Sequence, residues 1–341
     1  MSTTTAAPTA ESASETTEAP PVPDLLEAAE RGYQRFDEEL PALSLYGWAM
    51  QHLDHEPGEW DETAVHVSDY RYSLSPEEGG CDRQLFHRFR QDAASDPTLW
   101  MRMMWDQGFA LQIRFSWLLT QGLPEPWSLE AVEMDVSEGL PGDDVGSCDL
   151  VLSAPGHVLG IEMKTQRGRA FRYLDEPKPS HVIQSEGEAQ ALKSLFPDRE
   201  VSHRLVYLDR EGQNTPLVFP TETGLEAEKR VLEASHYANE IRGRANSDGD
   251  APDPLPPQIE VRENKGPNSI YLKELWPCDY CDYKGESCPG ALPESLKGHG
   301  IVAKGDHTDP DGLDIKAGPD IADEVEMEIA RAVQAENVKT K

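Results

Sequence analysis

The sequence has no apolar run long enough to cross a membrane. Its longest apolar stretches, such as residues 115–120, are far shorter than the roughly 20 residues that a transmembrane helix requires. The first 23 residues have neither a basic start nor an apolar stretch, so we expect no secretory signal. The sequence therefore excludes an integral membrane protein and predicts a cytoplasmic location.

Basic residues are scarce. The chain of 341 residues has 31 lysines and arginines against 63 acidic residues, for a net charge of −32. Such a charge favours solubility, or function at high salt, and argues against a surface that binds nucleic acid throughout. No lysine precedes Lys164, yet residues 164–172 contain four basic side chains and no acidic one. This strip indicates either a confined contact with an anion or a solvated loop.

Cysteines are few and odd in number: Cys81, Cys148, Cys278, Cys281 and Cys288. An odd count in a chain without a signal peptide argues against a disulfide framework and favours a reducing compartment. The last three lie within eleven residues, and with Cys81 they would give four thiolates, enough for a zinc ion or an iron–sulfur cluster. Reduced thiols packed in the core are the alternative, and Cys148 is interpreted as packing.

The periodicity of apolar residues predicts a mixed α and β chain. Residues 1–24 are expected to be a disordered tail, residues 25–64 a helical region, residues 65–295 the main domain and residues 296–341 a polar extension with an amphipathic helix at 321–333. Helices are predicted at 25–40, 81–90, 99–119, 179–195 and 223–242, and a short extended piece at 65–72. Strands are predicted at 129–136, 148–153, 158–163, 205–208 and 217–219. This order favours an α/β (α+β) fold with a mixed sheet.

Two carboxylates and a lysine fall on neighbouring predicted strands. Asp149 begins one strand, and Glu162 and Lys164 end the next, which a hairpin connection would bring to the same edge. Alternation places Glu162 and Lys164 on one face and Met163 in the core. Two converging carboxylates repel each other unless a divalent cation lies between them, and oxygen ligands suit Mg²⁺ or Mn²⁺. Lys164 could orient or deprotonate a water and stabilise charge on a phosphorane. A solvated surface charge pair is the alternative reading.

An Asp followed thirteen residues later by Glu-x-Lys is the pattern of the PD-(D/E)xK nucleases. Together with the split cysteine frame, it makes the chain resemble the RecB-like branch of that superfamily, and within it the iron–sulfur exonucleases related to the CRISPR-associated ones and their viral relatives. The segments that carry the resemblance are 67–69 with 81–85, 146–149, 162–164, 181–184 and 276–283, so it spans roughly residues 65–290.

This resemblance implies a restriction-endonuclease-like core, with a mixed central sheet flanked by helices and a cysteine-clasped cluster region that joins N- and C-terminal segments. It implies a metal-dependent DNA nuclease, an exonuclease, with residues 65–295 as the nuclease domain. The [4Fe–4S] cluster ligands would be Cys81, Cys278, Cys281 and Cys288. The Mg²⁺ or Mn²⁺ ligands would be Asp149, Glu162, the Met163 carbonyl and Gln112. The catalytic residues would be Asp149, Glu162, Lys164 and Gln184, and the phosphate contacts Arg167, Arg169 and Arg172.

The implied substrate is single-stranded DNA or duplex ends, processed in repair, recombination, replication, or CRISPR-like or viral pathways. The implied partners are a second copy of the chain, or recombination or adaptation proteins; for a viral protein the location would be the host cytoplasm. No membrane partner is expected. Nothing in the sequence separates DNA from RNA as the substrate.

Two positions depart from the family pattern. The family usually has a metal-binding His in a Gly-x-x-x-His setting, and here Gly108 is followed by Gln112. Its Gln-x-x-x-Tyr motif has Glu188 in place of the tyrosine. Both departures keep open an alternative, a non-catalytic DNA-binding or adaptor protein on a degenerate nuclease fold with a zinc staple. We expect Trp100 and Trp105, in the helix at 99–119, to be residues of the protein core, with base stacking as the alternative role.

Overall fold

The structure, a computed structural model, describes residues 19–35, 42–52, 61–75, 78–247, 249–252, 258–261, 269–273, 281, 283, 287–288, 301–304 and 314–316. Most of the tail predicted for residues 1–24, the end of the helix predicted at 25–40, the amphipathic helix at 321–333 and Cys278 lie outside these residues.

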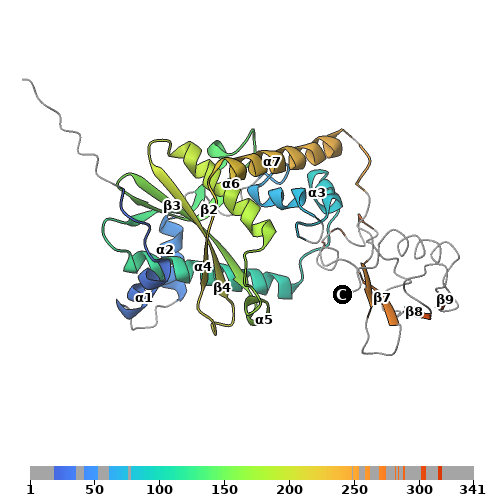
Figure 1. Cartoon of the computed structure of the whole chain (residues 1–341), viewed down its shortest axis with the longest axis horizontal. Coiled ribbons are helices and arrows are strands. Elements are labelled where there is room, and N and C mark those ends of the chain that lie inside the picture. The colour runs from blue at the N-terminus through green and yellow to red at the C-terminus, as the bar shows by residue number, and fades with distance from the viewer. Residues whose placement is uncertain are drawn as a thin grey trace, which may run out of the picture.

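A five-stranded mixed sheet lies at the centre of the described chain (Figure 1). Its strands follow one another across the sheet in chain order: β1 Ser128–Asp135, β2 Ser147–Ala154, β3 His157–Gln166, β4 Glu200–Asp209 and β5 Leu217–Pro220. Neighbouring strands are antiparallel, except β3 and β4, which are parallel and pair along their full length. All five strands were predicted, although β4 is longer than expected.

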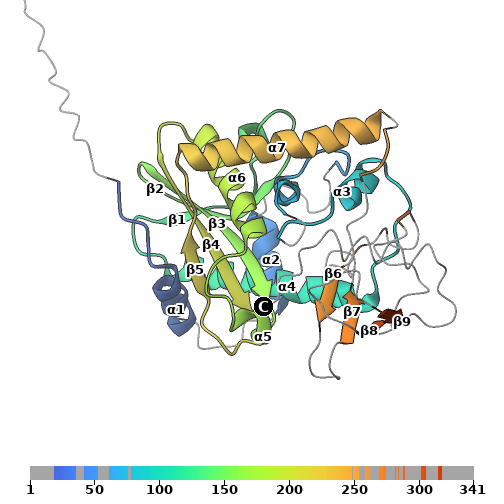
Figure 2. The same ribbon diagram turned by 45° about the vertical axis from the view of Figure 1, so that its right-hand side comes forward.

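Helices cover both faces of the sheet. One face carries α6 Pro179–Leu195, α7 Leu225–Asn246, α3 Asp82–Phe89 and the 3₁₀ helix η1 Val67–Ser73. The other face carries α1 Leu25–Arg35, α2 Ala42–His52 and α4 Leu99–Gly122. Helix α6 is the crossover that parallel strands β3 and β4 require, and Pro179 begins it. Figure 2 shows α7 lying across α6, with α1 and α4 on the opposite side of the sheet. The chain is therefore an α+β protein with a mixed sheet flanked by helices.

The core has one apolar layer on each face of the sheet. Val151 and Leu192 belong to the layer beneath α6 and α7, whereas Leu150 and Ile161 belong to the layer against α4. Strand β3 is buried from residue 157 to residue 163 because both of its faces are covered, which explains its nearly continuous apolar sequence.

Helix α4 extends beyond the sheet. Thr98 caps it by accepting a hydrogen bond from the Met101 amide at 3.2 Å, and its buried residues begin at Gly108. Trp100 and Trp105 precede that point and are 59% and 55% exposed. The prediction that these two tryptophans belong to the core is wrong, because the spacing that indicates a buried face does not show how much of the helix contacts the sheet.

Residues 67–73 form the 3₁₀ helix η1 rather than the predicted extended piece. The Asp69 carboxylate explains the turn, because it accepts the His66 amide at 2.7 Å and binds Arg88 of α3 through both oxygens, at 2.6 and 2.7 Å. Only His66 pairs as a strand would, in an isolated bridge to Val145.

A second sheet lies towards the C-terminus. It has four antiparallel strands, β6 Gln258–Val261, β7 Ser269–Lys273, β8 Ile301–Lys304 and β9 Asp314–Lys316. Two short elements complete the fold, the 3₁₀ helix η2 Ser137–Gly139 and the helix α5 Gly168–Phe171. Within the described residues, no helix has both the length and the apolar content of a membrane span.

Candidate active site

The sheet brings the predicted carboxylates and lysine to one edge. The ladder between β2 and β3 ends at Leu150 and Ile161, so Asp149 and Glu162 lie side by side where the two strands separate. Strand β2 begins where antiparallel β3 ends, which is why residues thirteen apart in sequence meet. Met163 is 2% exposed and points into the layer beneath α4, so Glu162 and Lys164 share the opposite face, as predicted.

Gln112 reaches this edge from α4. Its amide nitrogen Nε2 donates to the Met163 carbonyl at 2.9 Å and to Asp149 Oδ2 at 3.3 Å, and the same Asp149 oxygen accepts the Met163 amide at 2.6 Å. Gly108 allows this close approach, because a Cβ there would lie 3.1 Å from the Thr165 hydroxyl. The side-chain N–H of Gln112 thus lies between an Asp149 carboxylate oxygen and the Met163 carbonyl oxygen.

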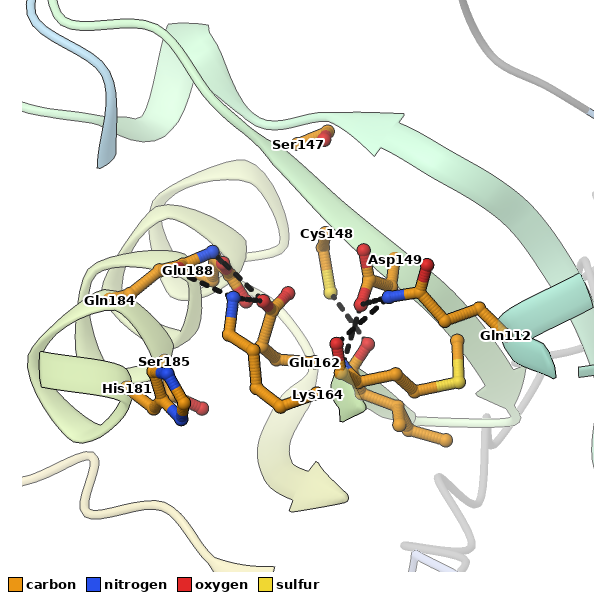
Figure 3. Close-up of polar contacts among 12 residues, drawn as sticks. Gln112, Ser147, Cys148, Asp149, Glu162, Lys164, His181, Gln184, Ser185 and Glu188 are labelled. Atoms are coloured by element: carbon orange, nitrogen blue, oxygen red, sulfur yellow. Dashed lines mark hydrogen bonds and ion pairs between the residues drawn. The ribbon is translucent and has the colours of Figure 1, made fainter. Parts of the chain in front are cut away.

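Lys164 lies at the centre of a second network, on the side of α6 (Figure 3). Its ammonium contacts Glu162 Oε1 and donates to Gln184 Oε1 at 2.9 Å. The Gln184 amide nitrogen donates to Glu162 Oε1 and to Glu188 Oε1, both at 2.9 Å. Gln184 therefore has its oxygen fixed on the lysine, because its nitrogen is bound to two carboxylates. Glu188 lies at the far end of this hydrogen-bond network.

Glu162 and Glu188 are buried, and Asp149 is half-buried near them. Burial raises the pKa of Asp149 well above its usual range, and the charges of Glu162 and Glu133 raise it further. Burial and the same charge of Glu162 also raise the pKa of Glu188. Burial lowers the pKa of Lys164, but the Glu162 and Asp149 charges outweigh it, and the net pKa is raised. The site thus contains more carboxyl groups than positively charged groups. The ammonium form of its lysine is favoured.

Glu133 of β1 belongs to this edge and was missed by the sequence reasoning. It lies between the β1 residues that pair with Leu150 and Cys148, hence opposite Asp149, and its carboxylate accepts the Ser147 hydroxyl at 2.9 Å. Its φ is +51°, a left-handed conformation that glutamate rarely adopts. No pattern of residue types marks such a position, because the conformation depends on tertiary structure.

His181 lies one helical turn before Gln184, on the same side of α6. Its Nδ1 forms a hydrogen bond with the Tyr207 hydroxyl over 2.9 Å, and that hydroxyl accepts the Lys178 amide at 3.0 Å. Burial, together with the charges of Lys164 and Lys178, lowers the pKa of His181 to about 2. His181 is therefore a neutral imidazole at physiological pH.

The basic strip leaves the sheet directly after β3. Arg167, Arg169 and Arg172 are exposed, and Arg210 at the end of β4 lies close enough for the Arg167 charge to contribute to its lowered pKa, after burial. Among the described residues, none of the three strip arginines forms an ion pair with a carboxylate. The strip is thus available to an anion from solution.

Segments far apart in sequence meet near Cys81. The Ser287 hydroxyl donates to the Ala93 carbonyl at 2.6 Å, and the His87 and Tyr283 rings lie 5.7 Å apart. Burial raises the pKa of the Cys81 thiol, and the nearby Cys288 contributes to the rise. Two of the four predicted cluster cysteines are therefore neighbours. Cys281 is half-buried, and Cys278 is outside the described residues.

No protein-family model matches the chain, and no curated protein matches its sequence. The functional argument consequently depends on the site itself.

Proposed function

We propose that the protein is a metal-dependent DNA nuclease of the RecB-like PD-(D/E)xK type, with a restriction-endonuclease-like core. The single observation that carries the proposal is the convergence of Asp149, Glu162 and Lys164 where β2 and β3 separate, with Gln184 bound to both Glu162 and Lys164. A surface charge pair would not have a carboxylate that is 2% exposed, as Glu162 is.

The residues present fit an oxygen-ligated divalent cation. The Asp149 carboxylate and the Met163 carbonyl already share one donor, the Gln112 amide, and Glu162 lies beside them. Rotation of the Gln112 amide would present its oxygen at the same point. These four residues would hold Mg²⁺ or Mn²⁺, which when bound supplies Lewis-acid stabilisation of charge on the scissile phosphate.

Lys164 acts by position and charge in this proposal. Burial lowers the pKa of Lys164, but the Glu162 and Asp149 charges raise it by more, so the ammonium form is favoured. This ammonium can hold the attacking water by a hydrogen bond and stabilise negative charge as it develops on the phosphate. Gln184 directs the ammonium, since its oxygen is fixed on Lys164 at 2.9 Å.

DNA would approach along the arginine strip. Arg167, Arg169 and Arg172 follow the catalytic strand directly and could bind successive phosphates. The remaining surface of a chain with net charge −32 repels DNA, so binding would be confined to this edge. We extend the proposal to single-stranded DNA or duplex ends as substrate, exonucleolytic cleavage in DNA repair, recombination, replication or viral processing, and a reducing cytoplasm as the location.

The second part of the proposal is a structural [4Fe–4S] cluster held by Cys81, Cys278, Cys281 and Cys288. The support is the proximity of Cys81 to Cys288 and the contacts of residues 283 and 287 with residues 87 and 93. Four thiolates are the usual ligand set of such a cluster, which would join the two ends of the nuclease domain.

The experiment compares Lys164→Ala with Lys193→Ala, a control at an exposed lysine of α6. Cleavage of single- and double-stranded DNA is measured with Mg²⁺ or Mn²⁺ and with EDTA. We expect the first variant to lose metal-dependent cleavage while keeping its circular dichroism spectrum, and the control to retain activity. Undiminished cleavage by a highly purified Lys164→Ala protein would remove Lys164 from the mechanism.

One observation favours a second function, a non-catalytic DNA-binding or adaptor protein. Gln112 presents a hydrogen-bond donor to Asp149 and Met163, and this donor satisfies the oxygens that a cation would otherwise bind. If the wild-type protein binds DNA but cleaves neither DNA nor RNA at any concentration of Mg²⁺ or Mn²⁺, this second function holds.

A further inference from the structure

Three ligand-type side chains meet in the core on the α6 face of the sheet. They are Cys148 of β2, Glu188 of α6 and His203 of β4, and one potential ligand atom from each lies within 4.8 Å of the other two. His203 Nε2 is 3.3 Å from Glu188 Oε2 and 3.8 Å from Cys148 Sγ. The Glu188 and His203 side chains are completely buried, and Cys148 is 0% exposed.

One oxygen of the Glu188 carboxylate is unsatisfied. Glu188 Oε1 accepts from Gln184 at 2.9 Å, whereas Oε2, which lies 3.3 Å from His203 Nε2, has no hydrogen-bond partner among the described residues. An unsatisfied buried polar atom costs about 1–3 kcal/mol. The Cys148 sulfur forms a hydrogen bond with His203 Nε2, so all three potential ligand atoms lie together.

The other nitrogen of His203 is held in the way that metal-binding histidines usually are. Its Nδ1 lies 3.0 Å from both the Ser185 and the Thr221 hydroxyl oxygens. A proton on Nδ1 that is donated to either hydroxyl leaves the Nε2 lone pair directed at Glu188 and Cys148. Gly160 makes this position possible, because a Cβ on β3 would lie 2.5 Å from the His203 ring.

We propose that Cys148, Glu188 and His203 bind a Zn²⁺ ion as its three protein ligands. Thiolate, imidazole and carboxylate form a typical zinc ligand set, and the sulfur disfavours Mg²⁺. Ligand atoms of a tetrahedral zinc site, at about 2.0–2.3 Å from the metal, lie about 3.3–3.6 Å apart. The two distances to His203 Nε2 are within a few tenths of an ångström of this range. A thiolate and a carboxylate balance the 2+ charge, which suits a fully buried position.

The ion would join three elements of the fold that are not adjacent in sequence, β2, α6 and β4. It would link β2 and β4 across β3 and fix α6 to both strands. Through Glu188 Oε1 it would also hold Gln184. The site does not depend on the proposed nuclease activity, and an inactive protein would bind zinc equally well.

The test is the metal content of the full-length protein, measured by inductively coupled plasma mass spectrometry after purification without chelators. Glu188→Gln is compared with Glu186→Gln, a control at a buried glutamate of the same helix that pairs with Arg230. Cys148→Ala is the second test variant. We expect wild type and Glu186→Gln to hold one more zinc per chain than either test variant, with the same iron content in all four proteins.

Equal zinc in all four proteins, or a folded wild type without zinc, would overturn the proposal. Zinc held by Cys81, Cys278, Cys281 and Cys288 does not affect the conclusion, because each comparison measures a difference in zinc content between variants. Should the test variants not fold, X-ray absorption at the zinc edge of the wild-type protein decides. A mixed sulfur and nitrogen/oxygen shell supports the site, and an all-sulfur shell or no zinc rejects it.

Discussion

The side-chain amide nitrogen of Gln112 donates to the Met163 carbonyl oxygen over 2.9 Å, and so links helix α4 to the strand that carries the proposed catalytic residues. The RecB-like nucleases that we propose as its family usually have histidine at this position. An imidazole would offer a lone pair where the glutamine offers N–H. Under that proposal, Gln112 would decide how readily a cation enters between Asp149 and Met163.

We predict that Gln112→His lowers the Mn²⁺ concentration for half-maximal DNA cleavage by on the order of tenfold, because a donor is replaced by a ligand. The measurement is a metal titration of cleavage beside wild type, with Mn²⁺ binding by calorimetry as a second readout. Gln107→His is the control, since Gln107 lies on an exposed part of α4, and among the described residues its side chain bonds only to the Arg210 carbonyl. An unchanged affinity in both readouts would mean that the cation does not bind at Gln112.

The arginine strip should set the salt dependence of DNA binding. We predict that Arg169→Ala and Arg172→Ala each weaken binding and reduce the slope of log Kd against log salt by about one, because each removes a phosphate contact. Fluorescence anisotropy with EDTA present measures binding without cleavage. Arg199→Ala, at an exposed arginine in the turn before β4, should leave the slope unchanged. Equal slopes in all variants would assign the strip to a solvated loop.

The cysteine proposal predicts brown protein on anaerobic purification, with an absorption band near the border of the visible and ultraviolet ranges, as expected for a [4Fe–4S] cluster. Cys81→Ala should lose the colour and the iron, whereas Cys148→Ala, at a cysteine of the sheet core, should keep both. Iron content and the visible spectrum are the measurements. A colourless wild type whose Cys81, Cys278, Cys281 and Cys288 bind one zinc ion would instead support the alternative function, in which zinc replaces the cluster.

His181 should make the protein less stable in acid. Its folded pKa of about 2 lies below the unfolded value near 6.5, so the unfolded chain binds more protons between these limits. The contribution of the neutral His181 to stability is present above pH 6.5 and is lost as the pH falls, by about 1.4 kcal/mol per pH unit at most. Urea unfolding at pH 7 and pH 5 should show a smaller pH effect in His181→Gln than in wild type. His236→Gln, at an exposed histidine of α7, should behave as wild type; the same pH effect in all three proteins would contradict the prediction.

The local part of the site could be predicted from the sequence, and the non-local part could not. Asp149, Glu162 and Lys164 lie on two strands joined by a tight turn, so alternation and a hairpin are sufficient to bring them together. Helix α6 could be predicted to begin at Pro179, because proline suits the first turn.

The meeting of Cys148 with His203 depends on tertiary structure. The two residues are 55 positions apart, and their contact requires both the α6 crossover and the absence of a side chain at Gly160. Glu133 was missed for a similar reason, since its place opposite Asp149 depends on the pairing of β1 with β2. Trp100 and Trp105 show the converse error, because apolar spacing predicted burial for a part of α4 that is exposed.

The hydrogen bond from Ser287 to Ala93 joins residues 194 positions apart, and the entire five-stranded sheet lies between them in the chain. During biosynthesis Ala93 leaves the ribosome long before Ser287, while β1 to β5 emerge in the order in which they stand in the sheet. Domains usually fold as they are synthesised, beginning from the N-terminus. The sheet can thus assemble before its ends are joined, and any inorganic centre at Cys81 would be inserted as a final step of maturation.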